Sequence, residues 1–113
     1  LQSQLSNATP NLTNTSNLTI AYEPVWAIGT GKAATIEVVE KTLSDLRSFM
    51  EVRWGSEGKE IPLMYGGSVT EANTNIFASS PLITGLLVGG ASLNAAAFIS
   101  LTRQFAEAKA LQG

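Results

Sequence analysis

Residues 21–32 have the sequence AYEPVWAIGTGK, in which a single carboxylate, that of Glu23, follows an apolar run and directly precedes a proline. A proline restricts the residue before it to extended backbone angles, so Pro24 fixes the direction in which the Glu23 side chain points. A carboxylate in a pocket that a closing loop can dry becomes a stronger base than one in water. The stretch therefore indicates a catalytic base, although a glutamate that ends a strand and faces solvent would have the same local sequence.

The residues after Glu23 have the composition of a lid, a loop that moves as a unit about a few hinge residues. Pro24, Val25 and Trp26 form a stiff leading hinge. Residues 27–31 form a glycine-containing tip, and residues 32–34 form the trailing hinge. We expect this loop to close over the base and to exclude water.

Three short apolar runs predict β-strands, at residues 18–23, 61–65 and 83–88. Each run is nearly all apolar, as expected for parallel strands that are covered on both faces. Helical patterns follow the strands, and a strand–helix alternation is the signature of a parallel α/β fold.

The predicted helices have identifiable starts. Thr35 is the expected N-cap of the first, and Glu37 suits the positive end of its dipole. Four apolar residues recur along one face of this helix: Val39, Leu43, Leu46 and Met50. Thr70 is the expected cap of a shorter helix that ends near Ser79, and a third helix is predicted over 94–111. The end of a further helix is expected at residues 1–5.

Two Gly-Gly turns follow the second and third predicted strands, at 66–68 (GGS) and 89–91 (GGA). Glycine allows unusual backbone angles and the close approach of a ligand. Free N–H groups at a helix N-terminus bind anions, most often phosphate. In parallel α/β folds the sites lie at the C-terminal ends of the strands, so the sequence predicts that these turns and Glu23 share one rim.

Composition excludes several kinds of function. The 113 residues suffice for one small domain, and 44% of them are hydrophobic against 14% charged. A net charge of −2 without a basic run argues against binding to nucleic acid or an anionic membrane. The chain has no cysteine and no histidine, which excludes disulfides and thiolate metal sites and removes the commonest general base. A soluble, cytoplasmic protein is the expectation, and the initial Leu1 suggests a piece of something longer.

Residues 7–19 are rich in Asn, Thr and Ser and predict a loop. Four Asn-x-Ser/Thr triplets begin there, at positions 7, 11, 14 and 17. Without a visible signal segment, we interpret these triplets as a product of the loop's composition rather than as glycosylation sites.

Three motifs together, AYEPVWAIGTGK (21–32), YGGSV (65–69) and LVGGASL (87–93), resemble the triosephosphate isomerase family in their order and spacing. The resemblance runs from about Asn17 to the C-terminus. It implies that residues 17–113 are the last three strand–helix units of an incomplete (β/α)8 TIM barrel. Residues 1–16 would then be the end of a preceding helix and a polar loop.

The resemblance also implies roles for individual residues. Glu23 would be the base that shuttles a proton between C1 and C2 of dihydroxyacetone phosphate and glyceraldehyde 3-phosphate. Residues 24–34 would be the lid. The N–H groups that bind the phosphate would be those of Gly29, Ser68, Gly89 and Gly90. Tyr65 would latch the closed lid at Ala34 and Ser68 would do so at Gly31, while Ile28 and Leu87 would pack over Glu23. No metal or organic cofactor is implied, and the parent enzyme would be a homodimer whose interface is largely absent from this chain.

The departures from the family are informative too. The family polarises the substrate carbonyl with a histidine and a lysine on earlier strands, but this chain has no histidine and Lys32 belongs to the lid hinge. A complete barrel needs about 250 residues and eight strands. We therefore expect the chain alone to be inactive, and to be unstable because an open sheet exposes two edges.

Three alternatives remain open. The first is another phosphate-binding barrel enzyme, in which Glu23 does different acid–base work. A glycosidase is disfavoured among such enzymes, because the other strand ends carry no paired carboxylates. The second is a non-catalytic, phosphate-binding partial barrel. The third is an incomplete sequence with no independent role.

Overall fold

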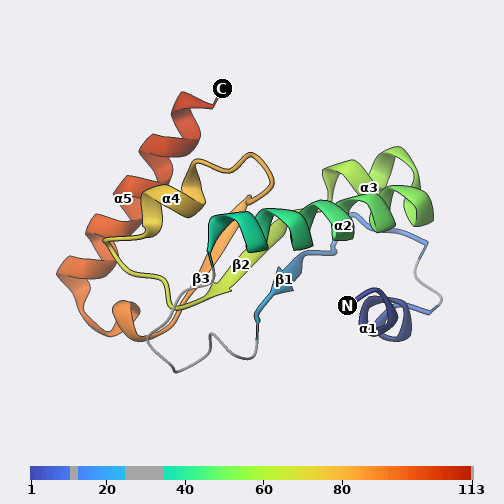
Figure 1. Ribbon diagram of the computed structural model, residues 1–113, viewed down its shortest axis with the longest axis horizontal. Helices are drawn as coiled ribbons and strands as arrows, with labels where there is room; N and C mark the ends of the chain where they lie inside the picture. The colour runs from blue at the N-terminus through green and yellow to red at the C-terminus, as the bar shows by residue number, and fades with distance from the viewer. Residues whose placement is uncertain (11–12, 25–34, 113) are drawn as a thin grey trace.

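The computed structural model describes residues 1–10, 13–24 and 35–112. In chain order the elements are α1 (Gln2–Ala8), β1 (Ile20–Tyr22), α2 (Ile36–Trp54), α3 (Ser56–Glu60), β2 (Leu63–Gly67), α4 (Thr74–Ala78), β3 (Gly85–Val88), the 3₁₀ helix η2 (Gly90–Leu93) and α5 (Ala95–Leu111) (Figure 1). All three predicted strands are present, and helices separate them as the sequence indicates.

The strands form one parallel sheet in the order β1-β2-β3. Because side chains alternate between the faces of a strand, the register defines two faces. The covered face carries Ile20, Tyr22, Leu63, Tyr65, Leu86 and Val88. The open face carries Ala21, Met64, Gly66, Gly85 and Leu87.

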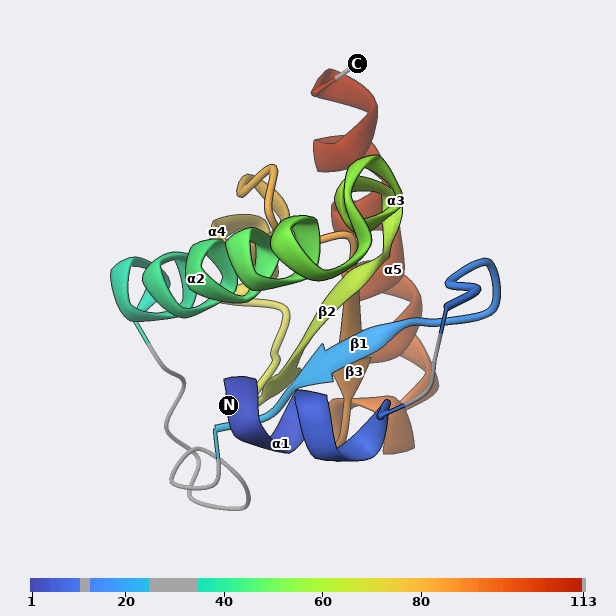
Figure 2. The same ribbon diagram turned by 90° about the vertical axis from the view of Figure 1, so that its right-hand side faces the viewer.

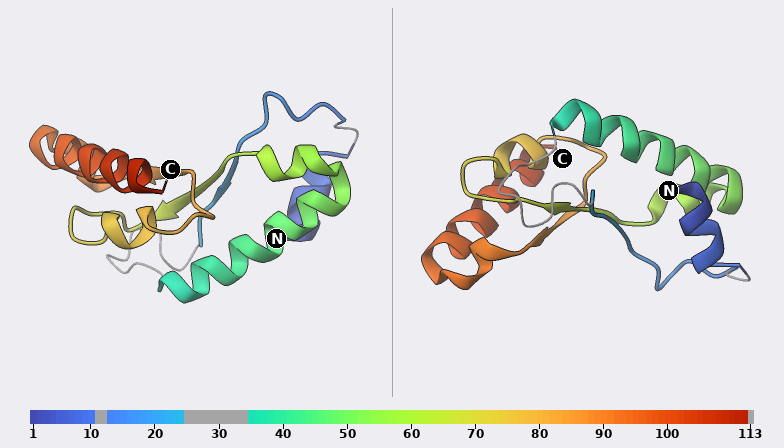
Figure 3. Two further views of the ribbon diagram at one scale, coloured as in Figure 1. Left: turned by 90° about the horizontal axis from the view of Figure 1, so that it is seen from above. Right: turned by 60° about the horizontal axis from the view of Figure 1, so that its bottom comes forward.

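The core lies on the covered face, where helices pack against the sheet (Figures 2 and 3). The predicted apolar face of α2 is confirmed, because Val39, Leu43, Leu46 and Met50 are all buried. On the open face, Ala21 and Leu87 are exposed. The expectation that the strands are covered on both faces is therefore wrong for the part of the chain that the structure describes.

The starts of two long helices agree with the sequence. The Thr35 hydroxyl accepts a hydrogen bond from the Val38 N–H at 3.4 Å, so Thr35 caps α2 as predicted. The Asn94 side chain accepts one from the Ala97 N–H at 3.0 Å and caps α5.

The start of α4 differs from the prediction. Thr70 does not cap the helix, which begins four residues later, at Thr74. The Thr70 carbonyl instead accepts hydrogen bonds from the Thr74 N–H at 3.0 Å and from the Thr74 hydroxyl at 2.6 Å. These bonds close a turn over residues 71–73, so the regular helix is shorter than the predicted span.

The end of α5 reaches back to the end of α4. Lys109 Nζ donates a hydrogen bond to the Ser80 carbonyl at 2.7 Å, and Gln112 Nε2 donates to the Ala78 carbonyl. The Ala78 carbonyl lies at the C-terminal end of α4, where a helix leaves carbonyl groups without internal partners. The Ser80 carbonyl also accepts a hydrogen bond from the Ile83 N–H at 3.3 Å. Burial lowers the pKa of Lys109 from its usual 10.5.

The N-terminal helix α1 extends to Ala8, beyond the predicted end at residue 5. Leu5 packs it into the core, beside α2 and β1 (Figure 2). The sequence did not predict α3, which has no large apolar residue in its five positions. Among the described helices, none is long and apolar enough to cross a membrane.

Candidate active site

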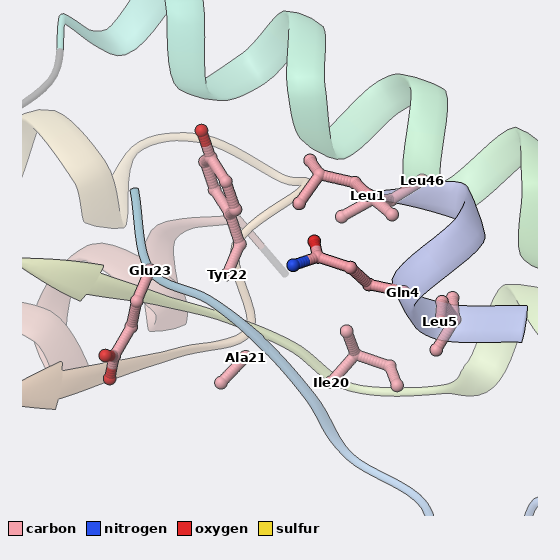
Figure 4. A pocket seen from close by; sticks show the side chains of 8 residues that line it. All are labelled: Leu1, Gln4, Leu5, Ile20, Ala21, Tyr22, Glu23 and Leu46. Atoms are coloured by element: carbon pink, nitrogen blue, oxygen red, sulfur yellow. The ribbon is translucent and has the colours of Figure 1, made fainter. Parts of the chain in front are cut away.

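Glu23 lies just beyond β1 and continues its alternation, so its side chain is on the open face. Figure 4 shows it on the opposite side of β1 from Tyr22. The Glu23 side chain lies directly over Gly66 of β2: a Cβ atom at position 66 would lie 2.6 Å from Glu23 Cγ and 2.9 Å from Oε1. Any residue other than glycine at 66 would displace the carboxylate. Pro24, the predicted hinge residue that follows, is buried.

A pocket of about 520 Å³ joins Glu23 to the loops that follow β2 and β3. Its lining residues are Glu23, Gly67, Ser68, Val69, Thr70, Leu87, Val88, Gly89, Gly90 and Ala91. The structure thus places the predicted base and three of the predicted phosphate-binding residues around one space. Leu87, which is predicted to pack over the base, lies on the open face opposite Gly66 in the register and also lines the pocket.

The glycines at these strand ends are needed for a reason other than unusual backbone angles. Gly55 is the only described glycine with a positive φ, at 65°. Gly66 and Gly67 lie within β2 rather than in a turn before a helix. Gly66 admits Glu23, and Gly67 admits the Tyr65 hydroxyl, which would lie 2.6 Å from a Cβ atom there. The expectation of unusual angles at these two glycines is therefore wrong. Protein side chains approach both of them closely, and the close approach of a ligand stays a prediction.

The Gly89–Gly90 turn is open by comparison. Both residues are exposed, and a Cβ atom at either would meet nothing within 4 Å. Two hydrogen bonds stabilise the turn: the Ser92 N–H and hydroxyl donate to the Gly89 carbonyl at 2.9 and 2.6 Å. Residues 90–93 form the helix η2, so the prediction of a helix start after this turn is correct. The open side of the turn faces the pocket, where an anion has room to approach.

Tyr65, the predicted latch, is fully buried on the covered face, where its ring stacks on Phe77 with 4.4 Å between centroids. Its hydroxyl therefore has a fixed position near Gly67. The remaining predicted lid and latch residues, Val25, Trp26, Ile28, Gly29, Gly31, Lys32 and Ala34, lie outside the described residues. Their roles stay predictions.

A second pocket, of about 510 Å³, lies between α1, α2 and the edge of β1 (Figure 4). Leu1, Gln4 and Leu5 line it from α1 and the residue before it, while Leu46 lines it from α2. Glu23 reaches its rim, but the other lining side chains carry no acid or base apart from the phenol of Tyr22. In the described ranges, no group of three or more His, Cys, Asp and Glu could hold a metal ion.

Sequence reasoning missed the contributions of Val69, Thr70 and Ala91 to the first pocket. Val69 and Ala91 belong to the motifs YGGSV and LVGGASL, and Thr70 directly follows the first of them, so membership of these motifs was the available signal.

Comparison with known proteins gives consistent results. A family model described as triosephosphate isomerase matches residues 1–105. The triosephosphate isomerase of Dehalococcoides mccartyi is 46% identical over 110 residues, which are 96% of this chain and 43% of that protein. The triosephosphate isomerase of Rhizobium etli is 42% identical over 105 residues, 93% of this chain and 41% of the relative.

Among solved structures, the crystal structure of triosephosphate isomerase from Bartonella henselae matches with a TM-score of 0.79 and 37% identity. The match covers 91% of this chain and 41% of the other, and it confirms that the three strand–helix units are part of a TIM barrel. The chain spans about two fifths of the length of the curated relatives that it matches.

Proposed function

Because the chain belongs to the triosephosphate isomerase family, we propose that it forms the C-terminal part of an enzyme that interconverts dihydroxyacetone phosphate and D-glyceraldehyde 3-phosphate. Its last three strand–helix units would span residues 17–113, after a helix end and loop at 1–16. The observation that carries the proposal is the pocket that Glu23 shares with Ser68, Gly89 and Gly90.

Glu23 is the base in this proposal. It takes a proton from one of the two carbons C1 and C2, and it returns the proton to the other through an enediol or enediolate. Its side chain is held over Gly66, and Leu87 provides an apolar wall on the same face. A lid over residues 24–34 would complete the enclosure and keep water from the carboxylate. This family is itself a well-known example of such loop closure.

The substrate phosphate would bind on the other side of the pocket, at backbone N–H groups. Ser68 and Gly89 both line the pocket, and in this proposal their backbone N–H groups donate to the phosphate. The Gly90 N–H at the start of η2 and the Gly29 N–H of the lid would add to them. Closure over a firmly held phosphate would also hinder its loss from the enediolate.

The chain does not supply all the groups that the reaction needs. It has no histidine, and the electrophile that polarises the carbonyl would have to come from the remaining three fifths of the barrel. We therefore propose that the chain alone has negligible isomerase activity. A homodimeric parent, with little of its interface in this chain, and a cytoplasmic location belong to the same proposal.

A chimeric barrel tests the proposal. In it, this chain replaces the matching part of the Dehalococcoides mccartyi relative, and isomerisation is measured in a coupled assay. We expect the chimera to be active, Glu23→Gln to lose roughly 10²- to 10⁴-fold in kcat, and the chain alone to show no turnover. The matched control is Glu37→Gln, which makes the same carboxylate-to-carboxamide change at an exposed position in the first turn of α2. This variant should stay active. Full activity of the Glu23→Gln chimera would contradict the assignment of the base.

A second candidate is a non-catalytic, phosphate-binding partial barrel, which the missing electrophile favours. The two can be separated by titrating the chimera with a phosphorylated mimic of the enediolate and with sulfate. An isomerase should prefer the mimic, whereas a simple anion-binding module should bind both alike.

A further inference from the structure

Asn73 immediately precedes α4, where an asparagine usually accepts a hydrogen bond from the first free N–H groups of the helix. Its side chain makes no such bond. Asn94 occupies the same position before α5 and does cap its helix, through the Ala97 N–H. The Asn73 amide therefore serves something other than the helix that it precedes.

The Asn73 side chain points back along the chain and holds the loop after β2 with both ends of its amide. Its Nδ2 donates a hydrogen bond to the Ser68 carbonyl at 2.6 Å. Its Oδ1 accepts a hydrogen bond from the Thr70 N–H at 2.8 Å. A carboxamide can donate and accept at the same time, and a carboxylate of the same shape cannot. One side chain thus fixes the peptide groups on either side of Val69.

The neighbouring hydrogen bonds complete this arrangement. The Val69 N–H donates to the Gly67 carbonyl at 3.0 Å, and the Thr70 carbonyl accepts from Thr74. The Ser68 N–H has no acceptor among the residues that the structure describes. Ser68 and Thr70 line the pocket that contains Glu23, whereas Asn73 is not among the residues that line it.

We propose that Asn73 is a positioning residue, which holds the Ser68 backbone in place for the phosphate of the substrate. This inference rests on the proposed function, because it requires that the pocket binds phosphate. A donor that is held in position before the anion arrives binds it more tightly than one that must first be ordered. Asn73 acts through Ser68 and does not touch the substrate.

The test is a titration of the chimeric barrel described above with inorganic phosphate, in which the backbone amide NMR signals of Ser68, Gly89 and Gly90 are followed. We expect Asn73→Ala to weaken phosphate binding about tenfold, as the loss of a well-formed hydrogen bond would. The Thr70 amide should also exchange with solvent faster. The matched control is Asn94→Ala, which should lower the unfolding midpoint by removing a true helix cap. It should leave the phosphate affinity within about twofold.

A second pair of variants separates the positioning of the Ser68 backbone from a general loss of stability. Asn73→Asp keeps an acceptor for the Thr70 N–H but cannot donate to the Ser68 carbonyl. Asn75→Asp adds the same charge at an exposed position of the same helix. We expect Asn73→Asp to bind phosphate several-fold more weakly than Asn75→Asp, and this pair decides the question if Asn73→Ala does not fold.

The outcomes distinguish the inference from the function on which it rests. Equal phosphate affinity in Asn73→Ala and the unsubstituted chimera, or in the two aspartate variants, would overturn the inference and leave the phosphate site standing. If phosphate moves none of the three amide signals in the unsubstituted chimera, both the phosphate site and the inference are overturned.

Discussion

The two faces of the sheet share three strands but differ in what they contact. On the covered face, Leu63 and Tyr65 are fully buried against helices. On the open face, Leu87 is 37% exposed, and Glu23 is exposed as well. Neighbouring positions of one strand therefore have different tasks, because alternate side chains point in opposite directions. The covered face holds the buried core, and the open face holds Glu23 and Leu87, which line the candidate site.

This comparison has a direct consequence for mutation. Leu63→Ala on the covered face should lower the free energy of unfolding by about 3 kcal/mol, because it leaves a cavity in a closely packed core. Leu87→Ala on the open face should cost clearly less, about 1 kcal/mol, because Leu87 is already 37% exposed and its truncation leaves no enclosed cavity. Chemical denaturation of both variants measures the two values. Similar losses would show that the open face is packed as tightly as the other.

A smaller effect is expected where the open face is crowded, at Gly66. Gly66→Ala should destabilise the chain by about 1 kcal/mol, because the new methyl group must displace the Glu23 side chain. Gly85→Ala is the matched control in the neighbouring strand, since the atoms nearest to its methyl group would belong to the flexible Met64 side chain, at 3.1 Å or more. We expect it to be nearly neutral in denaturation experiments. If Gly66→Ala is equally neutral, Glu23 does not rest on this glycine.

The smallest expected effect is on the pH dependence of stability, and it arises from Lys109 on α5. Burial lowers the pKa of Lys109 in the folded chain below 10.5, so the unfolded chain binds more protons between the two pKa values. Stability should therefore rise slightly with pH across that window. Unfolding of the unsubstituted chain and of Lys109→Met, measured from neutral pH to about pH 11, tests this expectation. The same slope in both would contradict it.

Much of the fold could be predicted because it depends on periodicity. The spacing of Val39, Leu43, Leu46 and Met50 determines which side of α2 is buried, whatever lies beneath it. The apolar runs likewise locate the strands. The covered and open faces could not be distinguished, since both consist of apolar or small residues. What differs between them is the presence of partner elements, which local sequence does not encode.

The sequence could predict which residues meet at the candidate site, but not the contacts that hold them there. Glu23 and the two loops follow strands of one parallel sheet, so their meeting at one edge follows from topology. The role of Gly66 depends on a contact with Glu23, which follows another strand. The Asn73 side chain bonds to the loop after β2 instead of capping α4. Thr70 has the residue type of a cap, but its carbonyl closes a turn instead.

The register of the sheet also bears on how the chain folds. Ile20 of β1 pairs with Leu63, whereas Tyr65 of β2 pairs with Leu86. The first pairing closes a loop roughly twice as long as the second, which adds about 0.6 kcal/mol of chain entropy to its cost. We therefore expect β2 and β3, with the short α4 between them, to associate first. The strand that precedes Glu23 would join last, so the proposed base would reach its place only after the loops that follow β2 and β3 have formed.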